Sequence, residues 1–194
     1  MLKLTGKIIL GLFGWKVAGK LPDLKKYVLI GAPHTSNWDF PLALFGALGI
    51  GLRFKWFAKH SIFKGPMGPI LKLFGGVPVN RAVHSSLIDR TIEIFNSKDE
   101  FVVGIMPEGT RSKTEYWKSG FYHIAVGAKV PIAFAFMDYG TKRVGIDGYF
   151  MPVGDIEKDM QTIRNFYKNI KGKRPEKQGE VRVKVKNQEN HIYN

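Results

Sequence analysis

The stretch "APHTSNWDF", residues 32–40, places a histidine and an aspartate five positions apart, at His34 and Asp39. A carboxylate that accepts a hydrogen bond from one imidazole nitrogen fixes the tautomer of the ring and leaves the other nitrogen able to take a proton. The pair therefore predicts a general base. The same residues also fit the start of a helix, because Ser36 with an acidic residue three positions later is similar to a capping box. On this stretch alone both interpretations stand.

Two further segments carry polar groups that suit a phosphate. The stretch "MPEGTRS", residues 106–112, combines the carboxylate of Glu108, the hydroxyl of Thr110 and the guanidinium of Arg111. In "GGVPVNR", residues 75–81, Arg81 follows a short apolar run and offers the bidentate geometry that phosphate accepts. A surface turn and an ordinary surface arginine are the alternatives for these two segments.

Together the three segments resemble the glycerolipid acyltransferase family, typified by the 1-acylglycerol-3-phosphate (lysophosphatidic acid) acyltransferases. The motifs that match in order and spacing are His-four residues-Asp at 34–39, Gly-five residues-Arg at 75–81, Pro-Glu-Gly-Thr-Arg-Ser at 107–112 and Val-Pro-Ile at 130–132. The resemblance covers about residues 27–137. Pro33 stands where Asn commonly precedes the histidine, and Met106 where Phe commonly precedes Pro-Glu-Gly. These departures concern the acceptor lipid more than the reaction.

The resemblance implies transfer of an acyl chain from acyl-coenzyme A or acyl-carrier protein to the free hydroxyl of a lysolipid. The expected acceptor is 1-acyl-sn-glycerol-3-phosphate, which gives phosphatidic acid, and a lyso-aminolipid is the alternative within the same chemistry. His34 and Asp39 are then the catalytic dyad, and Lys59 is a candidate for stabilising the oxyanion. The residues implied for substrate binding are Arg81, Glu108, Gly109, Thr110, Arg111 and Lys59. The resemblance implies no metal and no bound cofactor.

Predicted strands alternate with predicted helices, which indicates a single α/β domain with a largely parallel or mixed sheet flanked by helices. The resemblance implies the same fold, that of the glycerol-3-phosphate acyltransferases. Strands are predicted over 26–32, 53–58, 75–81, 101–106, 130–139 and 142–147, and helices over 39–51, 65–74, 84–97, 119–129 and 155–170. The His34 segment and the 106–112 loop each follow a strand, at the edge where such sheets bind ligands.

The charge balance favours anionic partners. The 194 residues contain 30 Lys and Arg against 16 Asp and Glu, a net charge of +14. Such a surface attracts lipid headgroups, phosphorylated substrates or nucleic acid. A nucleic-acid-binding module is the rival class, supported by Trp56, Tyr116 and Trp117 near lysines. The acyltransferase resemblance assigns the charge instead to anionic substrates and an anionic membrane surface, with no nucleic acid expected.

Two chemistries find no support in the sequence. The absence of cysteine excludes disulfides, thiolate-bound metal and a cysteine nucleophile. A serine hydrolase lacks its usual sequence, because no Gly-x-Ser-x-Gly segment occurs.

Residues 1–20 are predicted to form an amphipathic helix at a membrane interface, followed by an acyltransferase domain over 21–170 and a basic tail over 171–194. At helical spacing the residues on the apolar face are Leu4, Ile8, Leu12 and Trp15, with Lys3 and Lys7 opposite. A helix packed on the core is the alternative. The apolar run within residues 1–20 is too short to span a bilayer. We therefore expect a cytoplasmic protein, peripheral on the inner face of the membrane.

The basic tail allows two interpretations. The segment "VRVKVK", residues 181–186, alternates as an exposed edge strand does. A solvated and partly frayed chain end is the simpler interpretation, and the sequence favours it over a dedicated binding site.

Overall fold

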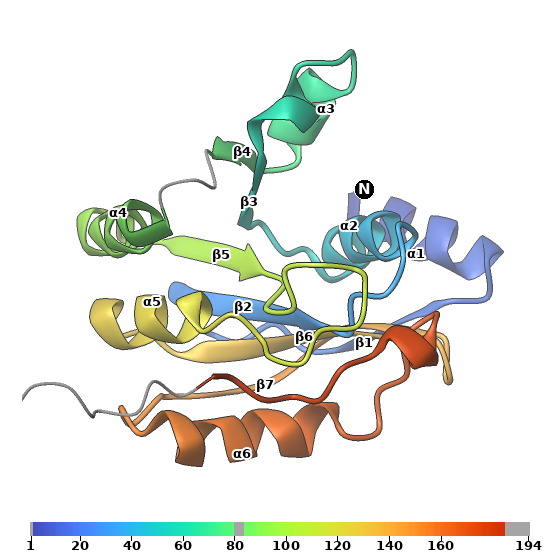
Figure 1. Cartoon of the computed structure of the whole chain (residues 1–194). Coiled ribbons are helices and arrows are strands. Elements are labelled where there is room, and N and C mark those ends of the chain that lie inside the picture. Colours follow the sequence, from blue (N-terminus) through green and yellow to red (C-terminus); the bar gives the residue numbers. More distant parts are fainter. Residues whose placement is uncertain (1, 80–83, 185–194) are drawn as a thin grey trace, which may run out of the picture.

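A seven-stranded mixed sheet forms the centre of the molecule in the computed structural model, which describes residues 2–79 and 84–184 (Figure 1). The strands are β1 (Lys16–Gly19), β2 (Lys26–Ala32), β3 (Lys55–Lys59), β4 (Gly76–Val79), β5 (Phe101–Ile105), β6 (Ile132–Asp138) and β7 (Arg143–Phe150). Their order is β1-β7-β6-β2-β5-β3-β4, and only the β6–β7 pair is antiparallel among these neighbours. The predicted α/β domain with a mixed sheet is confirmed.

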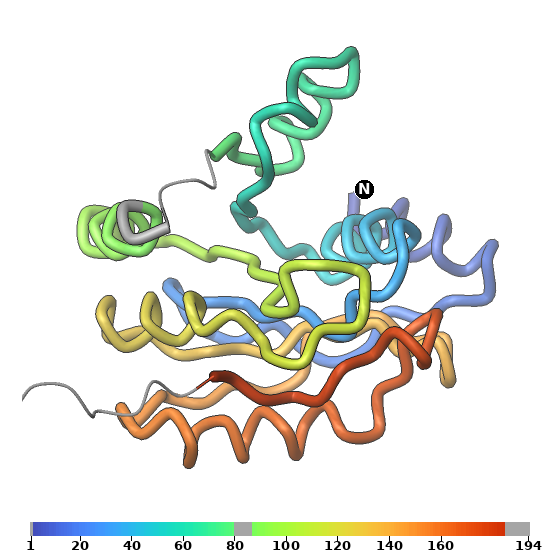
Figure 2. Tube along the Cα trace, in the orientation of Figure 1, coloured from blue at the N-terminus to red at the C-terminus, as the bar shows by residue number. Residues whose placement is uncertain are grey.

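Helices cover both faces of this sheet. They are α1 (Leu2–Leu12), α2 (Asp39–Ile50), α3 (Gly68–Leu73), α4 (His84–Ser97), α5 (Gly120–Ala128) and α6 (Ile156–Tyr167), with short 3₁₀ turns η1 (His60–Phe63) and η2 (Pro175–Lys177). Side chains alternate between the two faces of a strand. In β2, Val28 and Ile30 join the core under α4, α5 and α6, whereas Leu29 belongs to the face that α2 covers. Figure 2 shows α6 and the α1–α2 pair on opposite sides of the sheet.

The N-terminal segment differs from its prediction in its second half. The helix ends at Leu12, Gly14 adopts a φ of 74° that turns the chain, and residues 16–19 pair with β7 as an edge strand. Trp15, predicted on the membrane-facing side, is only 8% exposed and packs edge-on against Tyr139. A four-residue strand without a marked apolar run is too short to recognise inside a helical pattern.

The remaining part of α1 lies on α2 by a close approach of backbones. A Cβ on Gly6 would meet the backbone nitrogen of Gly49 at 2.6 Å, so only glycine fits at this crossing. The apolar side chains Leu4, Ile8 and Leu12 point away from the protein and are exposed. The apolar face of α1 therefore has no covering element among the described residues.

The segment from β3 to β4 forms an arm that stands out from the sheet (Figure 1). β3 pairs with β5 only at Lys55 and Trp56, and beyond that point it pairs with β4 alone. The arm also contains η1 and α3. Because β3 leaves its neighbour so early, the sheet is open beside β5.

The tail beyond α6 packs back onto the domain as far as the structure describes it. The backbone N–H of Trp117 donates to the carbonyl of Arg182 at 2.7 Å, and Val183 is buried with a single parallel bridge to Trp117. The described part of the tail is therefore packed against the domain and not frayed, while most of its charged side chains, such as Lys171, Lys173 and Arg174, are exposed as predicted for a solvated end. The predicted edge strand over 181–186 is reduced to this one bridge in its described part, and residues 185 and 186 lie outside the described residues.

Candidate active site

His34 and the Pro107–Ser112 loop leave the sheet at the same edge. β2 and β5 are parallel neighbours, with Ile30 opposite Ile105, so the segments that follow them start side by side. β2 ends at Ala32 and α2 begins at Asp39, which places His34 in the short connection between them. Parallel sheets bind ligands at this edge, and the structure thus brings two of the predicted motifs together.

The carboxylate of Asp39 has four hydrogen-bond partners. Its Oδ2 accepts the backbone N–H groups of Thr35 and Ser36, both at 2.8 Å, and lies 3.1 Å from Nδ1 of His34. Its Oδ1 accepts the hydroxyl of Tyr139 at 2.8 Å. Burial raises the pKa of this fully buried carboxyl, but the hydrogen bonds from His34, Tyr139 and Ser36 outweigh burial and hold the pKa below its ordinary value. Asp39 is therefore ionised at neutral pH.

The ionised carboxylate decides the proton positions on His34. A carboxylate oxygen only accepts hydrogen bonds, so Nδ1 of the neutral ring must carry the proton and donate it to Asp39. Nε2 is then unprotonated and able to accept a proton. The His34 side chain is 20% exposed, which keeps it reachable from the adjoining cavity. Asp39 also accepts the N–H of Ser36, but the predicted capping box is not formed, because α2 begins at Asp39 with Trp38 as its N-cap and without a side-chain cap hydrogen bond.

Glu108 lies on the other side of His34 with a different contact from the one predicted. Its Oε2 accepts the backbone N–H of His34 at 2.9 Å, and the residue is only 4% exposed. Burial raises the pKa of Glu108 to about 7, although this hydrogen bond opposes the effect. A buried carboxyl engaged with the backbone is poorly placed to bind a phosphate, and it ties the 106–112 loop to the His34 segment instead.

The rest of the loop presents its polar groups outward. Gly109 has a φ of 67°, a conformation that favours glycine, and its N–H closes a turn on Met106. Thr110 accepts the N–H of Ser112 at 3.2 Å and stays exposed. The guanidinium of Arg111 donates to the side chain of Asn37, which joins the loop to the turn after His34.

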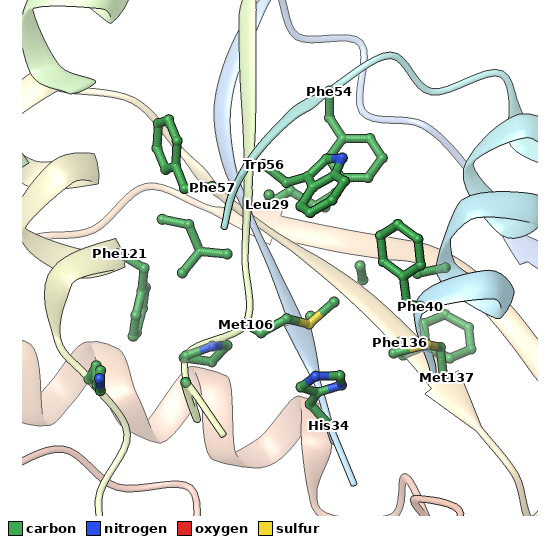
Figure 3. A pocket seen from close by; sticks show the side chains of 18 of the residues that line it. Leu29, His34, Phe40, Phe54, Trp56, Phe57, Met106, Phe121, Phe136 and Met137 are labelled. Atoms are coloured by element: carbon green, nitrogen blue, oxygen red, sulfur yellow. The ribbon is translucent and has the colours of Figure 1, made fainter. Parts of the chain in front are cut away.

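A cavity of about 950 Å³ opens beside the dyad. Its lining is mainly apolar and comes from the face of the sheet under α2, from the opening beside β3 and from α5. Figure 3 shows His34 at one end and Phe54 and Trp56 at the other, with Met106 between them. Thr110, Arg111 and Lys118 are polar residues of its wall. The cavity therefore joins an apolar interior to a basic group and a proton acceptor.

Lys59 is not brought to this centre. Lys59 ends β3 in the arm, is exposed, and lines neither this cavity nor the smaller one described below. Arg81 lies outside the described residues, so its predicted role stays a prediction. Sequence reasoning missed Tyr139 and Lys118. Tyr139 lies 100 positions from Asp39 and only the sheet brings it there, whereas Lys118 carries no local signal beyond its charge.

Neither a metal-binding cluster nor a bilayer-spanning helix occurs within residues 2–79 and 84–184. In these ranges no three His, Asp or Glu side chains converge so as to hold a metal ion. None of the helices there has the length and apolar character needed to cross a bilayer.

Comparison with known proteins gives the class of this site. The acyltransferase family model matches residues 16–135, so the chain belongs to the acyltransferase family and is an enzyme that transfers acyl groups. Among solved structures, the fold is similar to that of the 1-acyl-sn-glycerophosphate (LPA) acyltransferase PlsC from Thermotoga maritima. The TM-score is 0.58 at 23% identity, over 84% of this chain and 73% of that chain. A comparison with curated proteins gives no significant match.

Proposed function

We propose that this acyltransferase transfers an acyl chain from acyl-coenzyme A or acyl-carrier protein to the free hydroxyl of 1-acyl-sn-glycerol-3-phosphate, which gives phosphatidic acid. The observation that carries the proposal is the His34–Asp39 hydrogen bond at the end of a large apolar cavity, beside a basic loop. An apolar cavity of this size accommodates an alkyl chain, and the loop offers the guanidinium of Arg111 for the headgroup. The fold shared with an LPA acyltransferase agrees with this choice of acceptor.

The proposed mechanism uses His34 as a general base. Nε2 takes the proton of the acceptor hydroxyl while the hydroxyl oxygen forms a bond to the thioester carbonyl carbon. Asp39 stabilises the imidazolium that results. When the tetrahedral intermediate collapses, the carbon–sulfur bond breaks and the imidazolium returns the proton to the departing thiolate. The acyl chain thus passes directly between the two substrates, with no acyl-enzyme.

The acceptor phosphate is assigned to the outer part of the 106–112 loop. Arg111 provides charge-assisted hydrogen bonds and Thr110 a hydroxyl, while Gly109 allows the turn that presents them. Arg81 is a further predicted phosphate ligand. Glu108 supports the segment from beneath through the N–H of His34 and does not touch the phosphate. A phosphate held by Arg111 and Thr110 orients the acceptor hydroxyl toward His34 for attack.

Docking on an anionic membrane brings the lipid substrate to the site. The exposed apolar side chains of α1 include Leu4, Ile8 and Leu12, and Lys3 and Lys7 are exposed on the same helix. The arm adds the exposed residues Ile62, Met67, Ile70 and Leu73. In Figure 1 the arm and α1 lie on the side of the sheet opposite α6. Apolar side chains flanked by lysines suit an interface with anionic lipid.

Acyl transfer from palmitoyl-coenzyme A and palmitoyl-acyl carrier protein to a panel of lysolipids tests the reaction. We expect transfer to lysophosphatidate with the wild type, a loss of at least about 10³-fold in His34→Ala, and a selective loss for phosphate-bearing acceptors in Arg111→Ala. The control is Arg164→Ala, an exposed arginine of α6 on the opposite side of the sheet. Equal activity in His34→Ala and wild type contradicts the mechanism, and a preference for lyso-aminolipids corrects the acceptor.

Sedimentation with vesicles containing anionic lipid tests membrane docking separately. Ile8→Glu should lower the affinity for vesicles about tenfold, because it replaces an apolar contact worth about 1.5 kcal/mol with a repelled charge. Met151→Glu is the control, since Met151 is about as exposed as Ile8 but follows β7, away from α1. Equal loss in the two variants would show that net charge alone governs the binding.

A further inference from the structure

A second, smaller cavity lies behind the catalytic turn. It encloses about 340 Å³ and is lined by Thr35, Ser36, Asn37, Trp38, Arg111, Ser112, Arg174 and Lys177. The first four residues join His34 to Asp39, and Arg174 and Lys177 come from the tail. We call it the tail cavity. Arg111 and Ser112 also line the large cavity, so the two spaces adjoin at the 106–112 loop.

The tail is fixed at this place by contacts with the catalytic turn. The backbone N–H of Arg174 donates to Oγ1 of Thr35 at 3.2 Å. Gly172 packs so closely on Thr35 that a Cβ would meet its Oγ1 at 2.8 Å. The ammonium of Lys173 lies 5.0 Å from the centre of the Trp38 ring, a cation–π contact. Three successive tail residues thus contact the segment between His34 and Asp39. These contacts fix the backbone from which the exposed side chain of Arg174 extends.

The side chain of Gln178 closes the tail into a loop through two hydrogen bonds. Its side-chain amide donates to the carbonyl of Ile170 at 2.9 Å and accepts the N–H of Gly172 at 3.2 Å. The short turn η2 carries Lys177 between these points. Arg174 and Lys177 are therefore presented by a closed and hydrogen-bonded loop.

The charges around the tail cavity are unbalanced. Within the described residues, Arg182 forms ion pairs with Glu115 and Glu180, whereas Arg174, Lys177 and Arg111 form none. No carboxylate lines the tail cavity, and its remaining polar groups include the hydroxyls of Ser36 and Ser112. Guanidinium, ammonium and hydroxyl donors around one small space form a donor set that suits a phosphate.

We propose that the tail cavity binds a phosphate group of one of the two substrates, as an anion subsite that shares Arg111 and Ser112 with the 106–112 loop and adds Arg174 and Lys177 from the tail. The inference rests on the proposed function, in which both substrates carry phosphate: the acceptor at its headgroup, and the donor in coenzyme A or in the phosphopantetheine of the carrier protein. Because Arg111 lines both cavities, a phosphate bound here stays next to the reacting centre. Arg174 and Lys177 position the substrate and take no part in proton transfer.

The double variant Arg174→Gln/Lys177→Gln tests the subsite, and Arg164→Gln/Lys168→Gln is the matched control. Both remove two positive charges, but the control residues lie in and directly after α6 and line neither cavity. KM is measured for palmitoyl-coenzyme A against palmitoyl-N-acetylcysteamine, which has no phosphate, and for lysophosphatidate against monoacylglycerol. Thermal unfolding of both variants checks that the tail still folds.

One phosphate-bearing substrate should show a KM increase of about tenfold or more in the double variant, with its phosphate-free counterpart unchanged. An increase for palmitoyl-coenzyme A assigns the subsite to the donor, and an increase for lysophosphatidate assigns it to the acceptor. Unchanged KM values for palmitoyl-coenzyme A and lysophosphatidate overturn the proposal. An equal KM increase in the control variant also overturns it, because the general charge of the surface would then explain the effect.

A binding measurement separates this inference from the proposed reaction. Calorimetric titration of coenzyme A and of glycerol 3-phosphate is carried out on the wild type, on His34→Ala and on the double variant. His34→Ala should keep the affinity of the wild type, and the double variant should lose about tenfold for one ligand. If the wild type transfers no acyl group but this pattern holds, the proposed function fails and the anion subsite stands. If transfer occurs and neither affinity changes, the subsite fails alone.

Discussion

Two buried carboxyls flank His34, and their surroundings shift the two pKa values in opposite directions. Asp39 is fully buried and Glu108 is 4% exposed, so burial disfavours the charge of both. Among the described residues Asp39 accepts four hydrogen bonds, and its pKa lies below the ordinary value. Glu108 accepts one, and its pKa rises to about 7. The number of donors, more than depth, decides which carboxyl keeps its charge.

The difference separates two tasks at one histidine. Asp39 is the first residue of α2, where the helix N-terminus adds to the donors that favour a negative charge. In the proposed mechanism its permanent charge orients the ring and stabilises the imidazolium. Glu108 lies in the turn after β5 and accepts the backbone N–H of His34, and either protonation state leaves an oxygen able to accept it. Asp39 acts on the proton of the ring, and Glu108 acts on the position of the chain.

The largest effect that tests this comparison comes from removing each charge without changing the shape. Asp39→Asn should lower kcat by about 10² to 10³, because the amide oxygen still accepts the backbone N–H groups but no longer stabilises the imidazolium. Glu108→Gln should change kcat by less than about threefold at pH 7, since a neutral amide oxygen keeps the single hydrogen bond. Steady-state kinetics with both substrates at saturation gives these values.

An equal loss in the two variants breaks the distinction between the carboxyls. A loss confined to Glu108→Gln, with Asp39→Asn active, would move the proton-transfer role from the α2 side of the histidine to the loop side. Circular dichroism of both variants excludes misfolding as the cause of either result.

A smaller effect is expected from removing the hydroxyl of Tyr139, which donates a hydrogen bond to Asp39. Burial and Asp39 both raise the pKa of Tyr139, so its hydroxyl stays protonated and donates to Oδ1. Tyr139→Phe should lower kcat about tenfold and leave KM for both substrates unchanged, because one hydrogen bond to a charged group is lost next to the dyad. Tyr149→Phe, at an exposed tyrosine of β7, is the control. A change in KM with constant kcat would make Tyr139 a substrate contact and not a positioning residue.

The sequence predicted well where local signals were complete. The helix over 84–97 has the predicted bounds, and the strand over 26–32 is β2 itself. Pro22 and Pro33 stand on either side of the strand, and the apolar residues of the helix recur at helical spacing. The predicted contact between His34 and Asp39 is present, because both residues lie in one short and continuous motif, whereas the catalytic role of the pair and the binding role of the 107–112 loop stay predictions.

The features of the fold and the site that were not predicted depend on contacts between distant segments, which no local sequence pattern encodes. Tyr139 reaches Asp39 only because β6 lies beside β2, and Arg174 reaches Thr35 only after α6 has crossed the sheet. The motif did not reveal that Glu108 is turned inward, since a carboxylate in a polar loop is equally able to face solvent. Trp15 was placed on the wrong side because the helix ends three residues before it.

The smallest effect concerns stability, and it has opposite signs for the two carboxyls. The pKa of Glu108 rises from 4.5 to about 7 on folding, so the folded protein binds this proton more tightly than the unfolded chain. The wild type then loses stability as the pH rises from about 4.5 to 7, by an amount on the order of 2 to 3 kcal/mol. Glutamine does not titrate. Relative to the wild type, Glu108→Gln should therefore gain stability between pH 5 and pH 8.

Asp39 behaves in the reverse sense because folding lowers its pKa. Its ionisation stabilises the fold above the unfolded pKa of about 3.9, and that contribution is lost only when the pH falls below this value. The free energy difference between Asp39→Asn and wild type should thus stay constant from pH 5 to 8, while that of Glu108→Gln changes. Urea unfolding at several pH values measures both differences. A flat profile for Glu108→Gln would show that Glu108 stays charged in the fold, and the two carboxyls would then differ in position alone.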